Sequence, residues 1–229
     1  MKYLKYLLIC IPVAILSKIF HWSDLLTFVM ASLAIIPLAG YLGQATEEIA
    51  ARTGPKWGGF LNATFGNATE LIICFFALKA GMFDVVKASI AGSVLGNILL
   101  VLGSSILFGG LKHKELAFDA KLGNFTSTML LFAVVGLALP AVFTYSIPES
   151  TVSRDYTSFS IIVSVILLCI YVIGMIYSFK SQKDLYGVEH AEDIETTWPL
   201  WKSITILSAA TIVIAVLSEI LVGSIEPMT

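Results

Sequence analysis

Glu70 is the single acidic side chain in a long, otherwise uncharged stretch from Trp57 to Leu78. On a helix, Asn67 would share its face, because residues three apart are neighbours. Gly66 and Asn67 are weak helix formers, and a loosened turn there would free backbone carbonyl oxygens. One carboxylate, amide oxygens and free carbonyls make a hard oxygen site, which suits Ca²⁺ better than soft metals. The sequence therefore predicts a cation site formed by Glu70, Gly66 and Asn67, with Thr69 on the wall of its cavity.

The composition places this stretch inside a membrane. The 229 residues are 57% hydrophobic and 13% charged, whereas soluble domains are about 45–50% apolar and about 25% charged. A carboxylate near mid-span would cost at least about 2–3 kcal/mol if it faced lipid, so Glu70 is expected to face protein or water. The alternative is a structural acid, neutral and hydrogen-bonded to Asn67 or Thr69. The net charge of −2 gives no indication of a nucleic-acid partner.

The predicted fold class is all-α, a polytopic transmembrane helical bundle. A hydrocarbon core about 30 Å thick needs roughly 20 apolar helical residues. Seven segments fit, at about 3–20, 24–43, 57–80, 86–109, 122–145, 157–179 and 201–222. The first also fits a signal peptide, but no clear small-residue cleavage site follows it, so a retained helix is favoured.

The basic residues predict the orientation. With the amino terminus in the cytoplasm, ten of the 14 lysines and arginines fall on inside segments and four on outside segments. This bias follows the positive-inside rule. We therefore expect a cytoplasmic amino terminus and an outside carboxyl end for this chain.

The fourth predicted span also carries polar and small residues. Gly92 and Gly96 are four apart, and so are Ser93 and Asn97. Small residues let helices approach closely, so Ser93 and Asn97 are candidates for the cavity wall beside Glu70. Alternatively, they hydrogen-bond another helix.

Two stretches of these spans resemble a known family. Gly66 to Ile72 reads Gly-Asn-Ala-Thr-Glu-Leu-Ile, and Gly92 to Gly103 reads Gly-Ser-Val-Leu-Gly-Asn-Ile-Leu-Leu-Val-Leu-Gly. Both resemble the first α-repeat of the Ca²⁺/H⁺ exchanger (CAX) branch of the Ca²⁺/cation antiporters. The compact amino terminus looks more like bacterial members than plant vacuolar ones.

The resemblance implies an inverted-repeat antiporter fold, with about eleven spans in the full-length protein. In the family, a glutamate from each repeat meets its counterpart at the membrane centre and binds Ca²⁺ and H⁺ alternately. Glu70 takes that role here, with Ca²⁺ as substrate and no cofactor. The resemblance further implies a cell-membrane protein, the bacterial inner membrane in particular, that self-associates as a homo-oligomer.

A short internal similarity predicts where a second repeat begins. The stretch from Leu38 to Thr46 shares four residue types, at one spacing, with the stretch from Leu221 to Thr229. The first leaves its span on the inside and the second on the outside, as an inverted repeat requires. The partner glutamate would then lie roughly 183 residues after Glu70, beyond this sequence. We therefore expect a fragment that holds half of the site and does not transport alone.

The predicted organisation has four parts, and the third is acidic. Residues 1–23 form an extra first helix, 24–179 the first repeat with its motif at 57–103, 180–200 a cytoplasmic linker, and 201–229 the first helix of a second repeat. A solvated linker is the simpler interpretation of its charges. In the family an acidic segment at this position is thought to sense cytosolic cations, which makes these residues candidates: Glu189, Glu192, Asp193 and Glu195. Glu47 and Glu48, at the inner end of the second span, are candidates for attracting cations to the entrance.

The expected function is exchange of cytosolic Ca²⁺ for H⁺ by alternating access, because a proton and Ca²⁺ compete for one carboxylate. Na⁺, K⁺ or Mn²⁺ as the transported ion, and a channel without coupling, stay open. An intramembrane enzyme is not expected, since His21, His113 and His190 all lie outside the spans and no HExxH or GxSxG occurs. A natural half-length pair would need dual topology, which the charge bias opposes.

Overall fold

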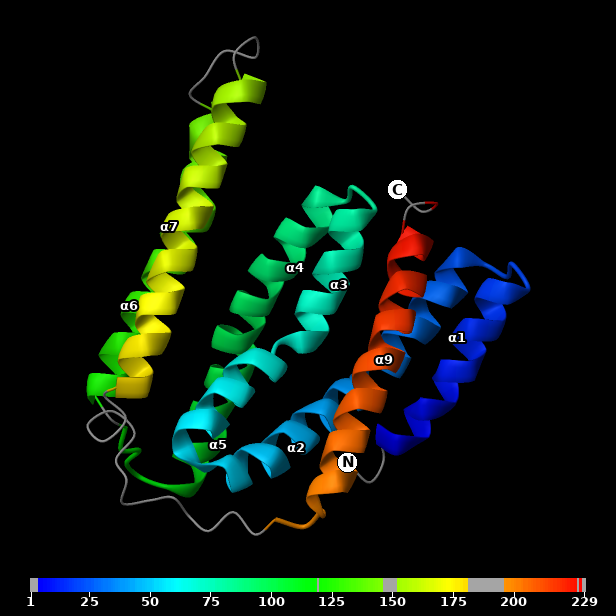
Figure 1. Cartoon of the computed structure of the whole chain (residues 1–229), viewed down its shortest axis with the longest axis horizontal. Coiled ribbons are helices and arrows are strands. Elements are labelled where there is room, and N and C mark those ends of the chain that lie inside the picture. Colours follow the sequence, from blue (N-terminus) through cyan, green and yellow to red (C-terminus); the bar gives the residue numbers. More distant parts are fainter. Residues whose placement is uncertain (1–3, 119, 146–151, 181–195, 226, 228–229) are drawn as a thin grey trace. The chain divides into compact units, whose positions relative to one another are not determined.

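The computed structural model describes residues 4–118, 120–145, 152–180, 196–225 and 227. Within these ranges the chain is helical and contains no strand, which confirms the predicted all-α fold class. The chain divides into two compact units, Met1–Lys114 with Asp193–Thr229, and Glu115–Glu192. Figure 1 shows the helices and their labels.

Three helices of the first unit enclose its core. They are α1 (Cys10–Ile19), preceded by a 3₁₀ turn over Leu4–Ile9, α2 (Asp24–Phe65) and α9 (Leu200–Ile225). Small residues of α1 and α2 let the helices pack closely around larger aliphatic side chains of α9. Fully or almost fully buried members are Ala14, Ala31, Ala34, Leu42, Ile214 and Leu217.

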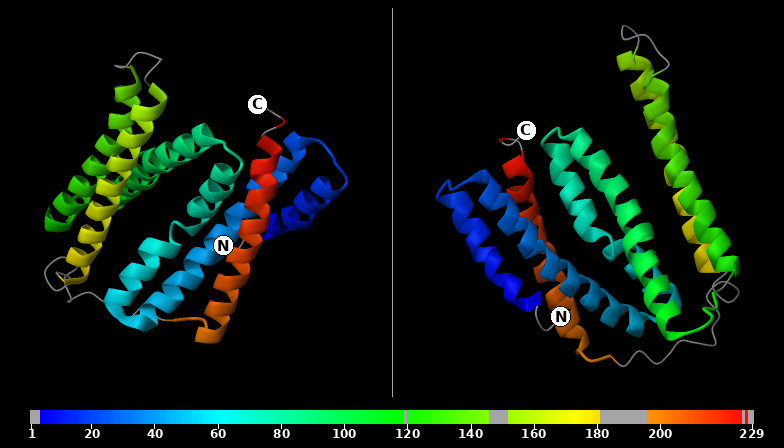
Figure 2. Two further views of the ribbon diagram at one scale, coloured as in Figure 1. Left: turned by 45° about the horizontal axis from the view of Figure 1, so that its top comes forward. Right: turned by 180° about the vertical axis from the view of Figure 1, so that it is seen from behind.

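α2 and α9 run antiparallel. The end of the first part of α2, Asp24–Gly54, lies beside the start of α9, where Glu48 accepts a hydrogen bond from the backbone of Thr197. The two ribbons run side by side in both views of Figure 2. Corresponding helices of an inverted repeat have opposite directions, so this arrangement fits the predicted organisation, and the second repeat itself stays a prediction.

A sharp corner interrupts α2 at Gly54. Its φ of 81° and ψ of 167° lie outside the helical region, and only glycine adopts such angles readily. The first part, Asp24–Gly54, is long and apolar enough to cross a membrane. It extends well past the predicted end at residue 43, because the polar residues from Gln44 to Thr53 stay helical.

The next helices form a hairpin. α3 (Ala68–Lys79) and α4 (Phe83–Leu95) are joined by a turn in which Gly81 has a φ of 75°. α4 continues through a π-helical segment, Gly96–Leu102, into α5 (Gly103–Lys112). Together α4, the π segment and α5 make one apolar span, Phe83–Lys112.

The second unit is a hairpin of α6 (Ala120–Tyr145) and α7 (Val152–Lys180). A Cβ placed on Gly136 would lie 2.5 Å from Leu167, and one on Gly174 would lie 3.2 Å from Met129, so both glycines permit the close approach. The rings of Phe125 and Tyr177 are 5.4 Å apart.

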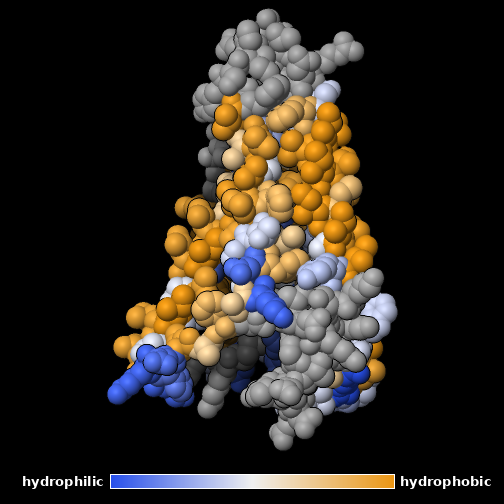
Figure 3. Space-filling view, turned by 90° about the vertical axis from the view of Figure 1, so that its left-hand side faces the viewer, coloured by the Kyte–Doolittle hydropathy of each residue, from blue (hydrophilic) through white to orange (hydrophobic). Residues whose placement is uncertain are grey.

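Hydrophobic side chains cover much of the face shown in Figure 3. On α6 and α7, large apolar residues such as Leu131, Ile161 and Ile173 are more than half exposed. Exposed apolar surface of this extent is expected where lipid, not water, is the solvent. Within the described residues, five helices are long and apolar enough to cross a membrane, or six if the bent pair at Trp57–Phe65 and Ala68–Lys79 forms one span. The predicted count of seven is not confirmed, because α1 and its preceding turn are short.

Candidate cation site at the break before α3

The bent span holds the predicted cation site at its break. The helix ends at Phe65, resumes at Ala68 and changes direction by 41°. Gly66 and Asn67 lie between the two parts, at the position where the sequence predicts a loosened turn.

The backbone at the break leaves hydrogen-bonding groups open. Gly66 donates its N–H to the carbonyl of Asn62 at 2.9 Å, and the first bond of α3 runs from Leu71 to the carbonyl of Asn67 at 3.1 Å. The last carbonyls of one helix and the first N–H groups of the next have no partner within their own helix. The turn at Gly66 is also tight, because a Cβ there would lie 2.4 Å from the Asn62 carbonyl oxygen.

Asn67 has its amide nitrogen engaged and its amide oxygen open. The side-chain nitrogen donates to the carbonyl of Ala63 at 3.3 Å. Its backbone angles, φ −111° and ψ 13°, lie outside the helical well. The Asn67 side chain is exposed, so its oxygen is accessible as a ligand.

Glu70 lies in the first turn of α3, and its side chain is exposed. The positive end of the helix dipole favours a negative charge there. Among the described residues Glu70 makes no hydrogen bond or ion pair, so neither Asn67 nor Thr69 satisfies it as the structural-acid alternative requires. Within the same part of the chain, no group of three or more His, Cys, Asp or Glu side chains could hold a metal ion.

The hairpin brings the two motif segments to one end. Because α3 and α4 run antiparallel, the first turn of α3 and the last turn of α4 lie at the same end of the hairpin (Figure 1). Ser93 is half-buried in that last turn, and Asn97 is exposed in the π segment that follows. π-helical segments often occur at functional sites. No described atom lies within 4 Å of a Cβ built on Gly92 or Gly96, so the close helix contact expected at these glycines is not made there.

A second carboxylate, Glu48, lies in α2 shortly before the corner at Gly54, and its surroundings differ from those of Glu70. Glu48 is 7% exposed, whereas its neighbour Glu47 is exposed. The Glu48 carboxylate accepts hydrogen bonds from Thr197, through N at 3.0 Å and Oγ1 at 2.5 Å, and from the Trp198 N–H at 3.3 Å. The sequence interpretation did not identify Thr197 and Trp198.

Two basic residues complete this contact. Arg52 donates from its guanidinium to the carbonyl of Trp198, and Lys202 Nζ lies 4.6 Å from the centre of the Trp198 ring. The four-residue spacing of Glu48 and Arg52 on α2 was the available sequence signal, since both then reach toward one partner.

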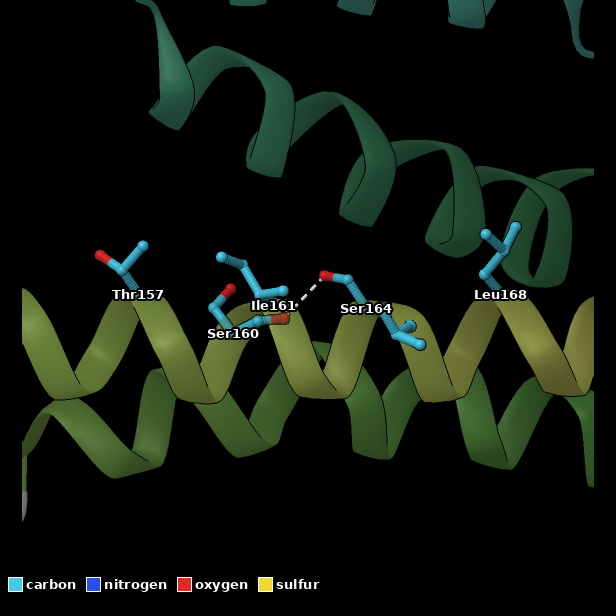
Figure 4. Close-up of a pocket in the computed structure, with 6 residues that line it drawn as sticks. Thr157, Ser160, Ile161, Ser164 and Leu168 are labelled. Carbon is cyan, nitrogen blue, oxygen red and sulfur yellow. Dashed lines mark hydrogen bonds between the residues drawn. The ribbon is translucent and has the colours of Figure 1, made fainter.

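The remaining sequence-predicted residues lie elsewhere. Glu189, Glu192, Asp193 and Glu195 fall outside the described residues, so their proposed cation sensing stays a prediction. In the second unit, α7 has a shallow hollow lined by Thr157, Ser160, Ile161, Ser164 and others (Figure 4). Ser164 there donates to the carbonyl of Ser160 at 2.8 Å, and no acidic residue lines the hollow.

Comparison with known proteins identifies the family to which the bent, glycine-broken span and its neighbouring apolar helices belong. The sodium/calcium exchanger protein family matches residues 23–180, and this chain belongs to that family. It is a multi-pass membrane protein.

Named relatives match nearly the whole chain. The Ca²⁺/H⁺ antiporter of Aphanothece halophytica is 39% identical over 97% of this chain and 64% of its own length. The Ca²⁺/H⁺ antiporter ChaA of Bacillus subtilis is 40% identical over 93% of this chain and 61% of its own length. The solved structure of native YfkE superimposes with a TM-score of 0.76 at 32% identity, over 98% of this chain and 62% of that one. The chain thus spans less than two thirds of the length of these relatives.

Proposed function

We propose that the full-length protein exchanges cytosolic Ca²⁺ for H⁺ by alternating access, with Glu70 as the carboxylate that both ions share. The observation that carries the proposal is the break at Gly66 and Asn67. It places open backbone groups and the Asn67 oxygen next to an unpaired Glu70 in the middle of a membrane span. The relatives are named Ca²⁺/H⁺ antiporters, which agrees with Ca²⁺ and H⁺ as the two exchanged ions.

Competition for one carboxylate supplies the coupling. A Ca²⁺ ion binds the ionised Glu70 together with neutral oxygens of Gly66 and Asn67, and a proton that occupies the carboxylate removes the charge that holds the ion. Loading one ion therefore releases the other. Ser93, Asn97 and Thr69 would line the cavity. A single carboxylate is a weak site for a divalent cation, so a second acidic residue from the remainder of the protein is required.

The orientation follows from the charge bias. We place the amino terminus in the cytoplasm and the protein in the plasma membrane of a bacterial-type cell. Protons that enter from outside then drive Ca²⁺ out of the cytoplasm. The acidic linker and Glu47 lie on the cytoplasmic side in this arrangement, where they would attract or sense cations. Self-association as a homo-oligomer belongs to the same proposal.

The test uses the full-length protein in liposomes. An imposed pH gradient should drive Ca²⁺ uptake, and a trapped pH indicator should report stoichiometric proton movement. Glu70→Gln should reduce both fluxes to background, whereas Glu115→Gln, which changes an exposed carboxylate between α5 and α6, should keep exchange within about twofold of wild type. Wild-type exchange by Glu70→Gln would refute the assignment of the site.

The same assay separates the rival functions. Ca²⁺ flux without a pH gradient and without proton movement would identify a channel. Uptake in the presence of excess Na⁺, K⁺ or Mn²⁺ would identify the transported ion, because a competing substrate lowers the Ca²⁺ flux.

A further inference from the structure

The contact between the end of α2 and the start of α9 joins segments that are 149 residues apart. We name it the α2–α9 clamp and define it by Glu48, Arg52, Thr197 and Trp198. Hydrogen bonds run both from the start of α9 to α2 and from α2 to the start of α9. The Glu48 carboxylate receives three hydrogen bonds, and the Trp198 carbonyl accepts one from Arg52.

The clamp differs from a surface ion pair. Glu48 is nearly buried, and two of its three donors are backbone N–H groups, which cannot rotate away as a lysine side chain can. Hydrogen bonds to an ionised acceptor are among the stronger ones in proteins. The Glu48 oxygens are therefore occupied by protein donors, and Glu48 does not serve as a cation ligand in this arrangement.

The position of α9 bears on the cation site. α3, which carries Glu70 in its first turn, packs on α9. Ala68, Ile72 and Ile73 of α3 lie against the core to which α9 contributes Ile214 and Leu217. A shift of α9 along α2 would therefore move the surface on which the Glu70 turn rests.

We infer that Glu48 is a positioning residue for transport: with Arg52 it fixes the start of α9 to the end of α2, and through α9 it sets the placement of α3 and Glu70. This inference rests on the proposed function, because positioning matters only if Glu70 binds the transported ion.

The first experiment measures the clamp without transport. Spin labels on the exposed positions Ala51 and Leu200, in a full-length cysteine-free background, report the distance between the ends of α2 and α9. Wild type should give one narrow distance distribution. Glu48→Gln should broaden it, because the new amide N–H₂ faces the Trp198 N–H and loses that bond. Glu47→Gln, the adjacent exposed carboxylate, should leave it narrow. An unchanged distribution in Glu48→Gln would overturn the inference.

The second experiment ties the clamp to exchange. Glu48→Gln should lower the maximal exchange rate several-fold. Thr197→Val removes only the hydroxyl donor and should lower it less. Glu48→Ala combined with Thr197→Val should be no slower than Glu48→Ala alone, because without the Glu48 oxygens the Thr197 hydroxyl has no bond to that side chain left to lose. Additive losses, or equal losses in Glu115→Gln at an exposed position outside the clamp, would contradict the inference.

The outcomes separate the two proposals. If Glu70→Gln retains exchange, the assignment of Glu70 as the ion-binding carboxylate fails, and the distance measurement still decides whether the clamp exists. If Glu48→Gln does not reach the membrane, Thr197→Val carries both measurements, and a narrow distribution with wild-type exchange in that variant would overturn the inference.

Discussion

Glu48 and Glu70 both belong to the first unit and are chemically identical, but their surroundings are opposite. Glu48 is nearly buried at the end of α2, and the protein supplies all three of its hydrogen-bond donors. Glu70 is exposed beside a helix break, and the described residues supply none. A carboxylate whose oxygens accept hydrogen bonds from the protein holds helices together, whereas an exposed carboxylate without such donors is accessible to an ion. The presence of protein donors at Glu48 and their absence, among the described residues, at Glu70 are the basis for proposing a structural role for Glu48 and an ion-binding role for Glu70.

The largest effect that would test this contrast is expected at the break. Gly66→Ala places a Cβ 2.4 Å from the Asn62 carbonyl oxygen, so the turn must shift and carry the Glu70 oxygens with it. Exchange should fall by about ten- to a hundredfold, the effect of misplacing a reacting group by about 1 Å. Proton-driven Ca²⁺ uptake in liposomes measures it. Gly92→Ala is the matched control, because nothing lies within 4 Å of its Cβ, and equal losses in both variants would show that the break is not special.

The next effect concerns the core that connects the two regions. Leu217 is fully buried in α9, so Leu217→Ala should leave a cavity and destabilise the protein by about 2–5 kcal/mol. Leu168→Ala, on an α7 side chain that is 62% exposed, should cost less than about 0.5 kcal/mol. Thermal unfolding in detergent compares them. Similar melting temperatures for the two variants would contradict the packing of α9 described above.

A smaller effect is expected on thermal stability, where Glu48→Ala should be more damaging than Glu70→Ala, the reverse of their order in transport. Glu48→Ala leaves the Thr197 and Trp198 N–H groups without their acceptor, and should lower the melting temperature by about a few degrees. Glu70→Ala removes no described contact and should leave it unchanged. The transport assay should rank them the other way, with Glu70→Ala the more damaging change. If the same variant were the more damaging one in both assays, the distinction between a structural Glu48 and an ion-binding Glu70 would be contradicted.

The smallest effect is expected at the rim of the clamp. Lys202→Met removes the ammonium that lies 4.6 Å from the Trp198 ring and keeps the length of the side chain. A cation–π contact of this kind contributes about 0.5–1 kcal/mol at a partly exposed position. A fall in melting temperature larger than that of Glu48→Ala would mean that the ring contact, not the carboxylate, holds α9.

Local features could be predicted from the sequence. Gly66 and Asn67 are weak helix formers in the middle of a span, and the break occurs there. The apolar segments predicted at 86–109, 122–145, 157–179 and 201–222 all lie within helices of the structure. In each case neighbouring residues alone decide the outcome, since hydrophobic length and helix propensity are local properties.

Features that depend on residues far apart in the chain could not be predicted from the sequence. Thr197 lies 149 positions after Glu48, and the four-residue spacing of Glu48 and Arg52 indicates only that their side chains share a helix face, not which segment they contact. The second span continues past residue 43 because the Gln, Glu and Ala residues that follow still favour a helix although the mean hydropathy has fallen. The π segment at Gly96–Leu102 has no sequence signal that distinguishes it from an α-helix.

The separation of 149 positions between Glu48 and Thr197 also sets the order in which the ribosome makes the two sides of the clamp. At about 5–20 residues per second, Thr197 is made roughly 7–30 s after Glu48. During that interval the α2 face that α9 later covers has no α9 to bind, and the Glu48 charge has no donor. For that time the face of α2 that α9 later covers contacts other surroundings, so the first part of α2 has to persist as a helix without its α9 partner.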